Sequence, residues 1–251
     1  MSAITNIDLL TVGVAVAANL MIGFIAFFSN KRSATHILFL LQAIILSIWS
    51  TINYISYQSH DPALTLILVR LVLFFAVPNS VIFMVLMHNF PSEKLKMSKR
   101  VLLILGVAVV IVMGITLSPL LFERVIINPT GAPTPVPGLG IIPFFILAIL
   151  SLPLGFFYLI RNYIRSEKEQ KGQFLLLLIG VILMFSVIVV LNFILPIVFQ
   201  NSSFIPLSAA FTFPFIALTA YAIYKHHLLN IKVVSSELLV FILAIVSLIE
   251  L

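Results

Sequence analysis

The sequence predicts an all-α membrane protein: a bundle of seven transmembrane helices with its N-terminus outside. Three observations support this fold class. The 251-residue chain is 62% hydrophobic and only 9% charged, whereas soluble domains average about 45–50% apolar and about 25% charged residues. It contains seven apolar runs of the length that a bilayer requires, about 20 residues each. Its Lys and Arg residues gather on one side of these runs. A soluble enzyme is therefore excluded.

The apolar runs are continuous and rich in Leu, Ile, Val and Phe. This favours helices, because the strands of a membrane barrel alternate lipid-facing and lumen-facing residues. The expected spans are residues 8–29, 36–57, 63–88, 101–121, 141–161, 174–199 and 205–225. An eighth apolar segment, 238–249, is too short to span a bilayer. We therefore expect a seven-helix module over residues 1–234 and a truncated further membrane helix over 235–251.

Two connections between the spans have a composition of their own. Residues 122–140 contain a series of Pro, Gly, Asn and Thr residues, which predicts an irregular loop or a small hairpin on the outer side. The polar segment 166–172 is predicted to continue the fifth span as a solvated helix, in which Glu167 and Lys171 are spaced i to i+4.

The basic residues give the orientation. Of the 14 Lys and Arg residues, Arg124 falls on the opposite side and Arg70 within the third span. The other twelve fall on one side: Lys31, Arg32, Lys94, Lys96, Lys99, Arg100, Arg161, Arg165, Lys168, Lys171, Lys225 and Lys232. The positive-inside rule predicts that this side is cytoplasmic. The basic excess then faces anionic lipid, so the bilayer is the expected partner and nucleic acid is not.

Arg70 is the charged residue placed within a span, about 10 Å below the expected outer end of its helix. Two interpretations are open. The guanidinium could be structural, reaching the outer interface or pairing with one of three outer acids. It could instead belong to a ligand site or a switch, held by an Asn amide or an anionic ligand. The acids in question are Asp8, Asp61 and Glu123.

Three asparagines lie within the expected spans. Asn53 and Asn192 are predicted at a depth similar to that of Arg70, and Asn19 lies nearer the middle of its span. If these side chains face inward, they form a polar outer pocket. The alternative is that each simply forms hydrogen bonds to neighbouring helices.

No acidic residue is expected deep in a span, which argues against a cation-coupled pump but leaves a neutral transporter or channel as an alternative. The chain has no Cys, so thiolate metal sites are excluded. His226 and His227 are sequence neighbours that cannot share one helix face, and a metal site is not expected there. A retinal Schiff base would need a Lys in the middle of the last span, and residues 205–224 contain none. We expect no cofactor and no metal.

Four spans contain a proline, which removes a backbone donor and favours a kink. Such kinks are either hinges or static features of shape. The residues are Pro78, Pro153, Pro196 and Pro214.

A recognisable stretch leads out of the seventh span. It reads Ala220-Tyr-Ala-Ile-Tyr-Lys-His-His-Leu-Leu-Asn-Ile-Lys-Val-Val. It resembles the exit sequence of the N-terminal seven-transmembrane sensor region of bacterial histidine kinases. The third span is also similar to that family, with Arg70, Pro78 and the Phe90-Pro91 dipeptide, and so is the Pro/Gly-rich outer loop. The resemblance covers residues 8–234.

The resemblance implies a sensory input module in the plasma membrane, with no catalysis of its own, that signals to a cytoplasmic output domain in cis. The chain departs from a complete kinase in having no phosphoacceptor helix or ATP-binding boxes. The expected coupling exit is Pro214, Lys225, His226 and His227. The stimulus is an unidentified small ligand, and a second copy of the chain is a candidate partner. A small-solute transporter or channel and a membrane scaffold stay open as alternatives.

Overall fold

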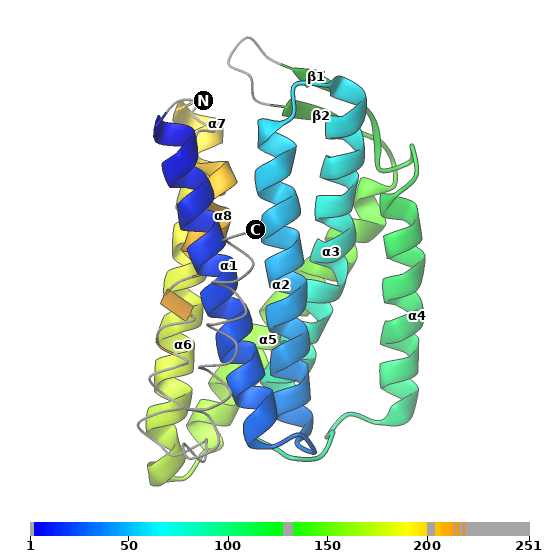
Figure 1. The fold of residues 1–251 in the computed structure, drawn as a ribbon. Helices are drawn as coiled ribbons and strands as arrows, with labels where there is room; N and C mark the ends of the chain where they lie inside the picture. The colour runs from blue at the N-terminus through cyan, green and yellow to red at the C-terminus, as the bar shows by residue number, and fades with distance from the viewer. Residues whose placement is uncertain (1–2, 128–132, 200–203, 213, 216–217, 219–251) are drawn as a thin grey trace.

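The computed structural model describes residues 3–127, 133–199, 204–212, 214–215 and 218, and it is a bundle of long helices (Figure 1). Six helical stretches of the described chain are long and apolar enough to cross a membrane. The long helices are α1 (Ala3–Ser29), α2 (Ala34–Gln58), α3 (Pro62–Asn89), α4 (Lys99–Thr116), α5 (Ile141–Arg165) and α6 (Lys168–Val189). The prediction of a polytopic helical bundle is confirmed.

The sixth span continues beyond α6 through a π-helix, η1 (Val190–Ile194), and a short α7 (Leu195–Phe199). The next described elements are η2 (Ile205–Leu207) and α8 (Ser208–Phe211), at the start of the expected seventh span. About half of that span lies outside the described residues, as do Lys225, His226 and His227 of the expected exit. The seventh helix and the segment 235–251 therefore stay predictions.

The two ends of the bundle differ in character. The turns between α1 and α2, α3 and α4, and α5 and α6 lie at one end, which we call the basic end (Figure 1). Ten of the twelve basic residues predicted to share a side gather there, from Lys31 to Lys171, and the other two lie outside the described residues. The opposite end carries strands β1 (Phe122–Ile127) and β2 (Pro133–Pro137), and we call it the hairpin end. Which end faces the cytoplasm stays a prediction.

The hairpin confirms one of the two alternatives for the outer loop. β1 and β2 pair antiparallel, with Val125 opposite Pro135. The chain returns to α5 through Gly138 and Gly140, whose N–H groups donate to the carbonyls of Leu121 and Leu120 at 2.8 and 2.7 Å. A β-carbon on Gly138 would collide with the carbonyl of Leu120, so the close approach requires glycine.

Two predicted boundaries are wrong. The fourth span ends at Thr116, not at Leu121, because Ser118 turns the chain with its hydroxyl donating to Ile115 O, and Pro119 follows. With 18 residues, about 27 Å, α4 is still long enough to span. The segment 166–172 does not continue the fifth span either. Ser166 is extended, and Glu167 occupies the N-cap position of a new helix, α6.

Close helix packing holds the bundle together. In the basic half, Phe83 and Met87 of α3, Leu159 of α5 and Phe174 of α6 form one buried cluster. Gly155 of α5 makes this approach possible, since a β-carbon there would lie 2.6 Å from the Phe83 ring. Interior packing of this kind is the main attraction between helices in lipid, where burial from water contributes little.

Candidate functional site

The interior face of α2 is polar. Gln42, Ser47, Ser50 and Asn53 are all buried there, at spacings of three to five residues that place them on one side of the helix. Lipid cannot accept or donate hydrogen bonds, so a polar face of this kind is stable only when it is directed into the bundle. The best-connected part of this face is at the hairpin end, around Asn53.

Ser208 connects three elements at that end. Its hydroxyl donates to Ile205 O at 2.5 Å. The same oxygen accepts from Asn53 Nδ2 of α2 at 3.3 Å and from Asn192 Nδ2 of the π-helix at 3.1 Å. Asn53 Nδ2 also donates to Ile205 O, at 3.1 Å. We call Asn53, Asn192, Ile205 and Ser208 the Ser208 junction. Its central side chain has an exposed fraction of 0%.

Asn192 enters the junction from an irregular helix turn. Residues 190–194 form a π-helix within an otherwise α-helical span. Pro196 follows, and a proline lacks the N–H that a helix interior uses for hydrogen bonding. Asn192 Oδ1 is buried and has no hydrogen-bond partner among the described residues. The turn therefore presents one satisfied amide nitrogen and one unsatisfied amide oxygen.

The structure brings together two of the four predicted ligand or switch residues, Asn53 and Asn192, through a residue that the sequence analysis missed. Ser208 lies a few residues after the start of the expected seventh span, and a polar residue at that position was the available sequence signal. Asn19 lies elsewhere and donates to Ala43 O at 3.3 Å and to Ser47 Oγ at 3.4 Å. Those hydrogen bonds connect α1 to α2. For Asn19 this agrees with the second interpretation, in which each Asn simply forms hydrogen bonds to a neighbouring helix.

Arg70 is also outside the junction. Its Nη2 donates to the carbonyl of Phe122 at 2.5 Å, and its Nε is buried without a partner among the described residues. The partner is therefore a backbone carbonyl, not one of the acids or amides that the sequence suggested. The reason is tertiary: α4 ends early, and Leu121 and Phe122 insert into the cluster that β1 forms with α3 and α5. Asp61, one of the expected partners, caps the N-terminus of α3 through the N–H groups of Ala63 and Leu64.

The remaining polar contacts in the bundle include one more that the sequence analysis did not single out. Gln42 Nε2 of α2 donates to Asn79 Oδ1 of α3 at 2.5 Å, next to Pro78.

Pro214, one residue of the expected coupling exit, lies against α6, because a β-carbon on Gly180 would be 3.4 Å from the Pro214 carbonyl oxygen. No group of three or more potential metal-ligating His, Cys, Asp or Glu side chains occurs in the described residues.

The basic end has a polar junction of its own. Asn89 of α3 donates to Thr35 Oγ1 at 3.3 Å and to Ser92 O at 3.1 Å, and its Oδ1 accepts from Lys96 N at 2.9 Å. Thr35 Oγ1 also donates to Ser92 O, at 2.7 Å. We call Thr35, Asn89, Ser92 and Lys96 the Asn89 junction. Both ends of its central amide are satisfied, and it fixes the loop after α3 to the start of α2.

No curated protein and no solved structure matches the chain. Residues 11–232 match the family described as the N-terminal 7TM region of histidine kinase. The match covers well over half of the chain and confirms the resemblance that the exit stretch and the Phe90-Pro91 dipeptide indicated. The matched region is the membrane part and not a catalytic domain. This chain therefore belongs to the N-terminal 7TM region of histidine kinase family, as a multi-pass membrane protein.

Proposed function

We propose that the chain is the sensory input module of a histidine kinase in the plasma membrane, with its output domain following in cis. The Ser208 junction is the point where the hairpin end acts on the seventh span. One observation carries this proposal. Ser208 accepts hydrogen bonds simultaneously from α2 and from the π-helix of the sixth span, and it lies at the start of the span that leads to the exit.

A downstream domain responds only to movement of the helix attached to it, which here is the seventh. Movement of α2 or of the sixth span reaches that helix through the amides of Asn53 and Asn192. Signalling requires two states that differ in their contacts. The unsatisfied Asn192 Oδ1 offers the second set of contacts, since a shift of its turn or a donor from a ligand would give it a partner. π-helical turns frequently lie at functional sites.

The test is Ser208→Ala in the full-length protein, with basal autophosphorylation and membrane yield measured together. The variant removes the oxygen that accepts from Asn53 and Asn192, so we expect basal output to shift at least several-fold while yield is largely kept. Hydrogen bonds between membrane helices contribute only about 0.6 kcal/mol on average. Ser186→Ala is the matched control, because Ser186 is an exposed Ser on α6. Unchanged output from Ser208→Ala at normal yield would contradict the proposed role of the junction.

A further inference from the structure

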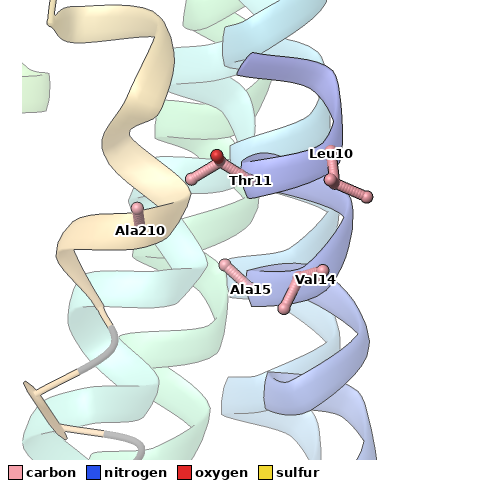
Figure 2. A pocket seen from close by; sticks show the side chains of 5 residues that line it. All are labelled: Leu10, Thr11, Val14, Ala15 and Ala210. Carbon is pink, nitrogen blue, oxygen red and sulfur yellow. The ribbon is translucent and has the colours of Figure 1, made fainter. Parts of the chain in front are cut away.

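A cleft opens between α1 and α8 near the hairpin end. It has a volume of about 450 Å³ and is lined by Leu10, Thr11, Val14, Ala15 and Ala210. Figure 2 shows four of these residues along α1, with Thr11 and Ala15 pointing toward α8, where Ala210 lies. The volume is within the range of small-molecule sites, about 300–1,000 Å³.

Small side chains make the hollow, and a packed floor supports it. Ala15 and Ala210 face each other across the cleft where larger residues would close it. Below it, Val12 and Ala15 of α1 pack with Tyr54 of α2 and Ala209 of α8 in one buried cluster. The rim is open, since Leu10 and Val14 have exposed fractions of 66% and 57%. The cleft therefore opens sideways, on a face of α1 that belongs to an expected membrane span.

The surroundings define the chemistry of an occupant. The lining is apolar except for Thr11 and belongs largely to a helix that is long and apolar enough to span a membrane, so an apolar group is the expected occupant. Asp8 lies on the same face of α1 as Thr11 and Ala15, one turn further toward the hairpin end. Among the described residues, no Lys or Arg forms an ion pair with Asp8. The site thus combines an apolar slot with an anionic group at its outer edge.

We propose that the α1–α8 cleft binds the single acyl chain of an amphiphile with a cationic head, the head lying at Asp8. This inference rests on the proposed sensory function and names the class of stimulus. Ala210 is two residues beyond Ser208 on the same short helix. A chain that fills the cleft therefore presses on the element that carries the Ser208 junction, and through it on the seventh span.

A second apolar hollow of about 340 Å³ gives an internal comparison. It lies between α1 and α2 and is lined by Val16, Leu20, Ile44, Ser47, Ile48, Thr51 and Ile52. None of these residues belongs to α8, and no acid lines the hollow. It should accept lipid chains without preference for the head group and without effect on output.

The binding test uses the purified chain in nanodiscs of zwitterionic phospholipid. The probe is a photoactivatable single-chain amphiphile with a quaternary ammonium head, and crosslinked peptides are located by mass spectrometry. We expect labelling of the peptide that contains residues 10–15, competed by the unlabelled cationic amphiphile roughly tenfold better than by a chain-matched alkyl sulfate. Asp8→Asn should abolish that preference. Ala210→Leu, which fills the cleft, should lower the competed labelling by roughly tenfold, the equivalent of about 1.4 kcal/mol.

Gly13→Leu is the control for Ala210→Leu, because a β-carbon on Gly13 meets nothing within 4 Å. Labelling that is equal on α1 and on the lipid-facing side of α4, or that no competitor reduces in the unaltered chain, would show ordinary boundary lipid and overturn the proposal. So would an unchanged signal in Ala210→Leu. The proposed function is tested separately, by adding the cationic amphiphile to the full-length kinase. Binding without a change in output would leave the site in place and refute its sensory role.

Discussion

The Ser208 and Asn89 junctions are both built around buried side chains, yet they differ in how completely they are satisfied. At the basic end, Asn89 uses both its nitrogen and its oxygen, and its partners are mainly backbone groups of an adjacent loop. At the hairpin end, Asn192 has an oxygen without a hydrogen-bond partner among the described residues, in a π-helical turn. A closed set of bonds has one arrangement of lowest energy, whereas an orphaned acceptor can gain a bond by moving. The comparison teaches that one helical bundle can hold a fully bonded polar junction at one end and, within its described residues, an incompletely bonded one at the other.

The largest expected effect concerns which junction faces which side of the membrane. Topology reporters fused after Glu169 should report cytoplasm, and reporters fused after Pro133 should report the outer side, because the basic residues gather at the Asn89 end. The outcome is all or none. The reverse pattern would place the Ser208 junction on the cytoplasmic side and remove its proposed role in sensing external stimuli.

The next largest effect is on stability, at the Asn89 junction. Asn89→Ala should lower the free energy of unfolding in mixed micelles by about 2–4 kcal/mol, since it leaves the Lys96 N–H and the Ser92 carbonyl without that partner. Asn30→Ala is the control. Its bond to Glu93 is exposed, and a change within about 0.5 kcal/mol is expected. Equal losses in the two variants would refute the rigid character assigned to the Asn89 junction.

Arg70 sharpens the comparison, because it belongs to neither junction. Arg70→Ala removes the donor to Phe122 O and should destabilise the protein by about 1.5–3 kcal/mol, with faster amide exchange in β1. Arg70→Gln should keep part of that stability, because its amide can still donate. If yield falls in both variants while the surviving protein signals normally, Arg70 is structural. Altered output at normal yield would instead assign it to sensing.

The smallest effect on stability is expected at Asn192. Asn192→Ala removes one bond to Ser208 but also a buried oxygen that has no partner in the part of the chain that the structure describes. The two changes should nearly cancel, to within about 0.5 kcal/mol. Basal output should still change, because Asn192 is the contact of the π-helix with Ser208. A large loss of stability together with normal output would show that the junction is as rigid as the one around Asn89.

The sequence by itself determined the fold class and most of the helices. Hydropathy alone locates spans such as α1 and α3, because a bilayer requires about 20 apolar residues and internally bonded backbone. The family also follows from short local motifs, the exit stretch after residue 220 and the Phe90-Pro91 dipeptide. These features depend on the order of residues along the chain, and they need no knowledge of which helices are neighbours.

The partners of the polar residues were decided only by the tertiary structure. Hydropathy places Arg70 and Asn192 at similar depths, but depth does not specify the direction in which a side chain points or the helix it faces. The early end of α4 brings the Phe122 carbonyl to Arg70, and the turn at 204–208 brings Ser208 between Asn53 and Asn192. Hydrogen bonds act over about 3 Å, so a shift of one residue in a helix end changes which groups meet.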